Sequence, residues 1–535
     1  MAALILFAYI ASTILLAGST SVLILLASYG LFLSTLSPFH TPPKGLRRVP
    51  GPKGHPFIGN TLQLSDRPQR ELTEWARTYG ELFQLRIGLT NWIYLNSAQA
   101  SRELLDRQAA FTSSRLPAPV ASGLIGADMR FGLMADGQRW RDFRGPYHKM
   151  LAPSRSRIYL PSQDLEAKQL IYDILVDNED GTEFYTHTRR FATSIIMTTT
   201  YGWRIPDTEG NDIKEIYGIL HELSGSMVPG TWIADMVPYL ARLPECLQWW
   251  RKEALQHFDH QSTLWMRYWK SFENGFRAGK APGCFAKELI ENSQQGKGLT
   301  ELENAFLAGS MVEAGAETTS TTLNSCFRYL AANPAIQARA HRELDKVIGR
   351  SRMPDFTDQE ALPYIEACFR ETSRLRPPSN NGVLHYTTAD LSYKGYHIPK
   401  NTVIAMNQYA MYYDPFRYKD PEQFVPERFL TPGDENDENY LPDRWLFGAG
   451  RRLCPGMHFA VNSMFIALAR VLWAFEIRPP LDEFGRESQL DVSDYAYEDG
   501  RFTVPKPFKL RFLCRDTGIK TVVRREWKQA SERLE

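Results

Sequence analysis

A ten-residue loop near the C-terminus contains the residue types with the clearest chemical use. This cysteine loop, FGAGRRLCPG, occupies positions 447–456, and a helical pattern from 458 to about 475 follows it. Cys454 is therefore predicted just before a helix N-terminus, where the helix dipole and free N–H groups stabilise a thiolate. A lone thiolate suits a soft, redox-active metal, and Arg452 is placed to meet an anion beside that metal. The alternative is a buried structural cysteine in a glycine-rich loop.

Two further patterns bring charged or donor groups together. Glu371 and Arg374 are three residues apart in a helical stretch and share one helix face, and Arg428 lies between them and the cysteine loop. Trp140 and Arg144 are one helical turn apart, and their indole and guanidinium donors can clamp a carboxylate. The alternatives are a surface ion pair for the first pattern and a plain core aromatic for Trp140.

A long helix is predicted to position a third group. The sequence TELE at 300–303 forms a capping box, and apolar periodicity runs on to Pro334, which gives a helix of about 30 residues. Near its middle lies the segment AGAETT, 314–319. Small residues allow a flat cofactor and a diatomic ligand to approach the backbone, the Thr318 hydroxyl can bond the carbonyl one turn back, and Glu317 offers a proton. A helix with ordinary small packing residues is the alternative.

Together these motifs resemble those of the cytochromes P450, which are haem-thiolate monooxygenases, and the resemblance covers nearly all of residues 45–515. It implies that Cys454 is the axial ligand of the iron in haem b (iron protoporphyrin IX). His385 aligns with a propionate-contacting position, although Leu384 stands where the family often has proline. The other residues that the resemblance assigns to haem binding are Arg452, Phe447, Gly448, Gly456, Trp140 and Arg144.

The resemblance also assigns catalytic and structural roles. Thr318 would order the protons needed for oxygen cleavage, with Glu317 relaying them; a different residue at 318 would have suggested a lyase or isomerase. Glu371, Arg374 and Arg428 would form a buried charge network behind the haem, which is costly unless fully paired.

The implied reaction inserts one atom of O2 into a C–H bond of a small apolar or aromatic substrate and reduces the other atom to water. No GxGxxG nucleotide loop is visible, so the electrons are expected from NADPH through a separate NADPH-cytochrome P450 reductase, with cytochrome b5 as a further donor. The cysteine loop and the residues after it look most like filamentous-fungal enzymes of secondary metabolism. Two alternatives remain: a haem-thiolate isomerase or lyase that needs no reductase, and a non-catalytic haem-binding membrane protein.

Substrate contacts are expected, by family position, from four segments: 113–131, 307–318, 379–383 and 499–502. The residues expected to form an apolar pocket are Met129, Phe131, Val312, Val383 and Phe502. Core packing is the alternative for each of them.

The N-terminus is predicted to be a membrane segment. Residues 1–43 contain no Asp, Glu, Lys or Arg, and 4–33 are apolar enough for one tilted span, or for two short pieces broken at 18–21. Lys44, Arg47 and Arg48 follow and by the positive-inside bias stay cytosolic. The chain is thus expected to have a membrane anchor at 1–36, a proline-rich hinge at 37–52, and a cytosolic body held on the lipid of a membrane such as the endoplasmic reticulum.

The remaining chain reads as one large domain, 53–515, with a charged tail, 516–535, that is either a solvated helix or frayed. Helical patterns dominate, and short alternating runs at 82–87 and 92–95 read as strands, as does a hairpin of 391–398 with 402–405. The expected fold class is mainly α with small β sheets, behind an N-terminal transmembrane helix, and the resemblance implies the cytochrome P450 fold. A net charge of +1 excludes nucleic-acid binding through the overall field, and the spacing of the six cysteines excludes a zinc knuckle.

Overall fold

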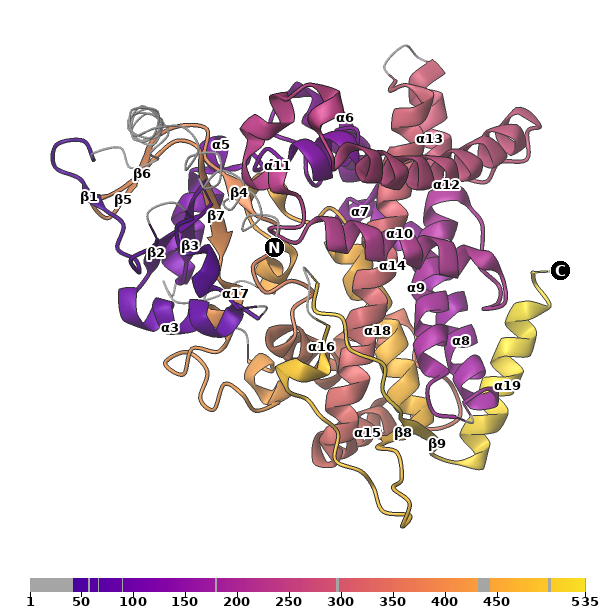
Figure 1. The fold of residues 1–535 in the computed structure, drawn as a ribbon. Coiled ribbons are helices and arrows are strands. Elements are labelled where there is room, and N and C mark those ends of the chain that lie inside the picture. Colours follow the sequence, from indigo (N-terminus) through magenta and orange to yellow (C-terminus); the bar gives the residue numbers. More distant parts are fainter. Residues whose placement is uncertain are drawn as a thin grey trace.

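The computed structural model describes residues 42–55, 58–65, 67–88, 90–178, 180–294, 298–431, 443–498 and 502–534. The predicted membrane anchor at 1–36 lies outside the described residues. Helices make up most of the described chain, and the strands gather on one side of the molecule (Figure 1). The predicted mainly α fold with small sheets is confirmed. The helices that position the site are α6 (Gln138–Met150), α8 (Leu160–Val176), α9 (Phe184–Tyr201), α10 (Asn211–Ser226), α12 (Arg251–Arg277), α14 (Glu301–Ala332), α16 (Pro363–Leu375), α18 (Met457–Ala474) and α19 (Thr517–Ser531).

Helix α14 runs through the middle of the helical part of the molecule (Figure 1). Its N-terminus has the predicted capping box: the Thr300 side chain accepts from the Glu303 N–H, and the Glu303 carboxylate accepts from the Thr300 N–H at 2.9 Å. The helix ends at Ala332, before Pro334, which begins the next helix, α15 (Pro334–Val347). Its 32 residues span about 48 Å at the usual rise per residue. The predicted long helix is confirmed.

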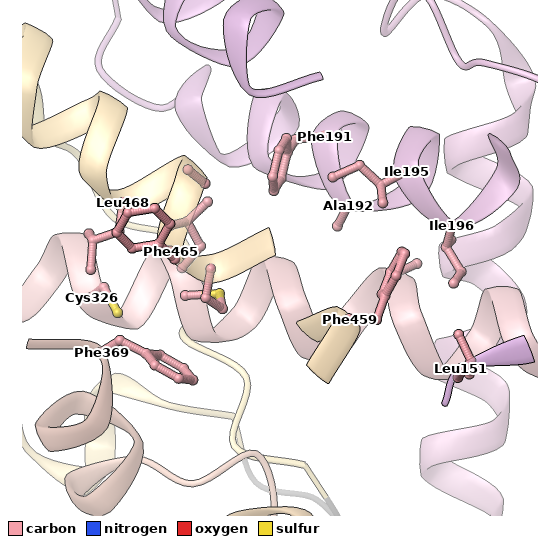
Figure 2. Packing of buried hydrophobic residues seen from close by; sticks show 14 of the residues in the cluster. Leu151, Phe191, Ala192, Ile195, Ile196, Cys326, Phe369, Phe459, Phe465 and Leu468 are labelled. Carbon is pink, nitrogen blue, oxygen red and sulfur yellow. The ribbon is translucent and has the colours of Figure 1, made fainter. Parts of the chain in front are cut away.

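The core lies where α9, α14, α16 and α18 meet. Figure 2 shows Phe465 and Leu468 of α18 above Cys326 of α14, with Phe369 of α16 below. Cys326 and Leu468 are fully buried. In the described part of the chain, α18 is the one helix long and apolar enough to cross a membrane, but 72% of it is buried inside the protein. It is therefore a core helix, and it presents its N-terminus to the cysteine loop.

The strands form three small sheets. One has the order β2-β3-β7-β4, a second β1-β6-β5, and the third pairs β8 with β9. The predicted hairpin was partly wrong: β5 and β6 do pair as neighbours, but β7 leaves them and lies parallel to β3 in the other sheet. The strands are β1 (Arg47–Arg48), β2 (Leu82–Ile87), β3 (Thr90–Leu95), β4 (His385–Tyr386), β5 (Leu391–Tyr393), β6 (Tyr396–Ile398), β7 (Thr402–Met406), β8 (Phe475–Arg478) and β9 (Arg511–Cys514).

Both ends of the described chain join the body more closely than the sequence indicates. The proline-rich segment is non-helical as predicted, but β1 pairs with β6, so the segment is attached to a sheet from Arg47 onward. The charged C-terminus is neither frayed nor merely solvated. It forms α19, which buries Ile519 and Val523 and stacks Trp527 near Tyr172 of α8, with ring centroids 5.9 Å apart.

Candidate functional site

The cysteine loop is held in a single conformation by its backbone. The Cys454 N–H donates to the Phe447 carbonyl at 2.9 Å, which closes the loop. Gly448 and Gly450 both have positive φ, at 94° and 57°, a region that residues with a Cβ rarely adopt. A Cβ on Gly450 would also overlap the carbonyl oxygen of Leu105. The glycines are therefore needed for this loop to pack against the preceding part of the chain.

Cys454 lies three residues before the start of α18, as predicted, but its electrostatics differ from the expectation. The Gly456 N–H and the charge of Arg144 lower the pKa of the thiol, whereas burial raises it more, so the pKa stands above its usual value. The helix N-terminus alone does not make a thiolate here, and a bound cation would be needed to deprotonate the sulfur. Part of the Cys454 side chain is accessible to a water-sized molecule, although the residue lies deep within the protein. Cys454 therefore faces a space enclosed by the protein.

Arg144 lies close enough to the sulfur for its charge to lower the pKa of the thiol, and Arg452 lies close enough to Arg144 for the two charges to oppose each other. The Arg452 guanidinium donates to the carbonyls of Ser113, Phe131 and Met134, at 2.7, 3.1 and 2.6 Å. Burial lowers the pKa of Arg452 to about 10, and it also lowers the pKa of Arg144. Carbonyl partners satisfy the N–H groups but cancel no charge, and the charge of Asp136 only partly offsets the burial of Arg452, so both arginines favour an anion nearby.

Trp140 completes this group of donors. Its ring lies under the Arg452 guanidinium, 4.2 Å from the centroid. Its Nε1–H is buried and has no hydrogen-bond partner among the described residues. Within the described residues, neither Arg144 nor Arg452 belongs to an ion pair. A soft sulfur ligand beside two uncompensated cations and one orphaned donor fits a metal-bearing group that carries carboxylates. Iron protoporphyrin IX, with its two propionates, has this chemistry.

His385 fits a propionate less well than these three residues. Its Nδ1–H donates to the Thr112 carbonyl at 2.9 Å, which fixes the tautomer of the neutral ring. To donate also through Nε2, the ring must be an imidazolium. Burial, and then the charges of Arg115 and Arg452, oppose that and lower the pKa of His385 to about 3. The neutral ring is the stable form in this protein, and its Nε2 accepts rather than donates.

The segment 314–319 in α14 confirms one expectation and corrects another. The Thr318 hydroxyl donates to the Ala314 carbonyl at 2.8 Å, one turn back, as predicted. Of the three small residues, however, only Ala314 is exposed, in the middle of an otherwise buried helix. A Cβ on Gly315 would come within 2.7 Å of Ile196 on α9, and Ala316 is buried. Successive residues turn by about 100°, so Ala314 faces the enclosed space while Gly315 lets two helices pack closely.

Glu317 faces a group of ionisable side chains that reaches the surface. Burial raises the pKa of its carboxyl, opposed mainly by the charge of Arg189. Glu498 and His221, both exposed, also act on that pKa. A carboxyl with a raised pKa keeps its proton at higher pH than an ordinary glutamate does. Glu317 is therefore suited to hold and release a proton between solvent and the interior.

Glu371, Arg374 and Arg428 form the predicted network. Arg374 contacts Glu371 through Nε at 2.7 Å and Nη2 at 2.9 Å, and Arg428 Nε lies 3.3 Å from the same carboxylate. Glu371 is fully buried, and it also accepts from the Val425 N–H at 2.9 Å. Arg374 Nη1 donates to the Tyr412 carbonyl at 2.7 Å. The surface ion-pair alternative is excluded, because both members of the central pair are inside the protein.

The four segments expected to contact substrate are partly brought together. The Thr503 N–H bonds the Pro378 carbonyl at 3.0 Å, which places the chain next to Phe502 beside the start of 379–383. The described structure holds Phe502 but none of 499–501. Met129 and Val312 are buried in the main core, as packing residues are, whereas Phe131 and Phe502 are half-buried and Val383 is 45% exposed. The role of these five residues in binding stays a prediction.

Three charged residues in these segments were missed by sequence reasoning. Arg115 bonds the carbonyls of Gly132, Val383 and Leu384, which connects two of the segments. Arg130 and Glu313 form a buried ion pair at 2.6 Å between the first of these segments, 113–131, and a third, 307–318. The available signal was an arginine and a glutamate of opposite charge, each inside an otherwise apolar pocket segment. Spacing in the sequence does not reveal such a pair, because 183 positions separate its members.

Comparison with known proteins agrees with the site. The model of the family Cytochrome P450 matches residues 49–492. The cytochrome P450 monooxygenase pgmC of Aspergillus terreus is 38% identical over 94% of this chain and 93% of its own length, and verL of Clonostachys rogersoniana is 36% identical over 90% of each. A solved structure of a zebra fish cytochrome P450 with abiraterone has a TM-score of 0.68 at 24% identity, covering 84% of this chain and 100% of the other, and supports the fold. The chain therefore belongs to the cytochrome P450 family and is an oxidoreductase of the monooxygenase type, with the haem-thiolate and O2 chemistry that the family implies.

Proposed function

We propose that this monooxygenase hydroxylates a C–H bond of a small apolar or aromatic molecule in secondary metabolism, using electrons from NADPH. The observation that carries the proposal is Cys454, which faces an enclosed space beside two uncompensated arginines. The intact Glu317 and Thr318 favour oxygen cleavage over isomerisation. Similarity to fungal cytochrome P450 monooxygenases supports the class of pathway.

Each residue of the site has a defined task. Haem, when bound, supplies the activation of oxygen. Cys454 holds the iron, while Arg144, Arg452 and Trp140 bind the carboxylates and orient the ring plane. The Thr318 hydroxyl, which donates to the Ala314 carbonyl, keeps its oxygen lone pairs free to accept a proton, and Glu317 passes it one taken from solvent. The apolar walls position the substrate and exclude water.

The proposal is tested with the full chain, purified in detergent and mixed with NADPH-cytochrome P450 reductase and ¹⁸O2. We expect NADPH-dependent incorporation of one labelled oxygen into a product found by comparing metabolites of cells with and without the chain. Turnover without NADPH or reductase would instead show the isomerase or lyase alternative. Haem binding with no product from any extract would show the non-catalytic alternative.

Thr318→Ala is expected to uncouple the reaction. Without the hydroxyl, the proton that Glu317 takes from solvent is no longer relayed through position 318, so product formed per NADPH should fall about tenfold or more while NADPH consumption continues. The measurement is product against NADPH consumed and hydrogen peroxide released. Thr318→Ser keeps the hydroxyl and should restore most coupling, and Thr319→Ala is the matched control on the same helix. Equal coupling in Thr318→Ala and Thr319→Ala would contradict the role of Thr318.

We infer that the reductase, and cytochrome b5, dock beside the cysteine loop. A surface hollow of about 460 Å³ lies there, lined by residues that include Arg107, Arg451 and Gly450. On α6, Arg141 is exposed and belongs to no ion pair among the described residues, whereas Arg139 and Lys149 pair with Glu303 and Glu288. Such a face attracts an acidic partner and brings it close to the iron ligand.

The double variant Arg107→Glu/Arg451→Glu is expected to weaken this docking. The KM for reductase should rise about tenfold at low salt, and the difference from wild type should shrink as salt screens the charges. The reduced-CO spectrum reports that the haem site is intact. Arg524→Glu/Arg525→Glu on α19, which changes two exposed arginines in the same way, is the charge-matched control and should leave the KM unchanged. A KM for reductase that stays at the wild-type value in the double variant would place the partner elsewhere.

We propose that residues 1–36 anchor the chain in the endoplasmic reticulum membrane, with the body in the cytosol. The support is the uncharged apolar run followed by Lys44, Arg47 and Arg48. Fractionation of cells that express the full chain or a form lacking 1–36 tests this: the full chain should resist extraction by alkaline carbonate and the truncated form should lose that resistance.

A further inference from the structure

A buried ion pair joins the loop before α6 to the central helix. Arg130 is 4% exposed and Glu313 6%, and they meet through two hydrogen bonds, Nε to Oε2 at 3.1 Å and Nη2 to Oε1 at 2.6 Å. The guanidinium also lies 6.0 Å from the ring centroid of Phe306. The pair has no part in the haem binding or the proton transfer proposed for this protein. Two apolar residues of similar volume often stabilise a core as much as a buried ion pair does, so stability alone does not explain this pair.

The third nitrogen of Arg130 is unsatisfied. Nη1 is buried and has no hydrogen-bond partner among the described residues. Glu313 does not serve it, because the carboxylate pairs with the Nε and Nη2 edge of the planar guanidinium, and Nη1 points away from that edge. A buried donor without an acceptor is costly, and native proteins keep few of them. The orphaned N–H groups therefore indicate an acceptor that comes from outside the chain.

Arg130 is also carried by a strained turn. Ala127 and Asp128, neither of them glycine, have φ values of 44° and 50°. The turn is held by two bonds at 2.9 Å, one from the Asp128 N–H to the Ser122 carbonyl and the other from the Ser122 hydroxyl to the Asp128 carboxylate. Strain of this kind persists where the surroundings impose it, and it clusters at ligand clamps. Here it directs the chain so that Arg130 reaches Glu313.

The pair joins two of the segments from which substrate contacts are expected. Glu313 precedes Ala314, the exposed residue in the middle of α14. On the other side, the carbonyl of Phe131, next to Arg130, accepts from Arg452, two residues before Cys454. Arg130 is thus anchored between the oxygen-facing helix and the cysteine loop, within the segments from which substrate contacts are expected.

We propose that Arg130, oriented by Glu313, binds a neutral carbonyl oxygen of the substrate through Nη1. The carbonyl belongs to a ketone, quinone, lactone or amide. The charges of Arg130 and Glu313 already cancel, so a neutral acceptor adds hydrogen bonds without adding charge. A carboxylate would leave one net negative charge in the interior, which is unfavourable. The inference rests on the proposed function and adds the substrate class: an oxygenated aromatic or polyketide-like molecule rather than a plain hydrocarbon.

The test is a titration of the ferric holoprotein, followed by the shift of the Soret band, with a matched set of probes. They are 1-tetralone, tetralin and the carboxylate of tetralin. In the double variant Arg130→Met/Glu313→Met, which leaves no charge unpaired, the ratio of the Kd for the ketone to the Kd for tetralin should rise about tenfold over wild type. Arg139→Met is the matched control, because Arg139 also pairs with a glutamate of α14 but is exposed, and it should leave the ratio unchanged.

A second variant keeps the test decisive if the double variant binds no haem. Glu313→Gln leaves Arg130 with an uncancelled charge, so the affinity for the carboxylate should rise about tenfold relative to the ketone. An unchanged ketone-to-tetralin ratio in the double variant, or an unchanged preference in Glu313→Gln, would overturn the inference and leave the pair a structural one. Binding needs no reductase. Carbonyl recognition without any oxygenated product would therefore overturn only the proposed function, and product formation without carbonyl recognition only this inference.

Discussion

Cys454→Ala is expected to abolish the red-shifted Soret band of the reduced, CO-bound protein and with it all NADPH-dependent product. The sulfur is the one ligand that the site offers to iron. In the part of the chain that the structure describes, no group of three or more His, Cys, Asp or Glu side chains is arranged to hold a metal ion. Burial raises the pKa of the thiol, so Cys454 would hold the iron as a thiolate only while that cation is bound, and alanine would offer no ligand at all.

Cys246→Ala is the matched control for this experiment. Cys246 is also an exposed cysteine, but it lies in the chain between α10 and α12, away from the cysteine loop. The control should keep the wild-type spectrum and turnover. A red-shifted band that persists in Cys454→Ala would show that another residue holds the iron, and the whole assignment of the site would then be wrong.

Glu371→Ala is expected to prevent accumulation of folded, haem-bound protein. The change leaves Arg374 buried with an uncompensated charge and also removes the acceptor of the Val425 N–H. Breaking one member out of a buried pair costs about 3–5 kcal/mol. A typical domain has only about 5–15 kcal/mol of stability, so the loss is a large fraction of the total. The measurements are the yield of protein with the reduced-CO band and the Tm of whatever is purified.

Two controls separate this effect from a general loss of charge. Glu371→Leu/Arg374→Met removes the central pair together and should cost less than the single change, because only the partly exposed Arg428 loses its carboxylate partner and no fully buried ion is left unpaired. Glu273→Ala breaks an exposed i,i+4 pair with Arg277 and should change the free energy of unfolding by less than about 1 kcal/mol. A Tm for Glu371→Ala within a degree of wild type would mean that the network does not hold this region together.

Much of this protein could be predicted from its sequence because the interactions concerned are local. The capping box at 300–303 and the proline at 334 act within one or two turns, so α14 was predicted to within a few residues. The Glu371–Arg374 contact and the Thr318–Ala314 hydrogen bond span three and four positions of a helix, which geometry alone brings together. The chemistry of the cysteine loop likewise follows from its glycines and its cysteine, which all lie within ten consecutive residues.

Contacts between residues far apart in the sequence could not be predicted, because they depend on how distant segments pack. Strand β7 reads as part of a hairpin, but its partner is β3, more than 300 residues away. A helical pattern does not say that Gly315 faces α9, or that burial outweighs the helix N-terminus at Cys454. Arg130 and Glu313 meet across 183 positions through a strained turn. Burial and charge pairing of this kind are properties of the assembled core, because each depends on every element that packs around the group, whereas a motif depends only on its near neighbours in the chain.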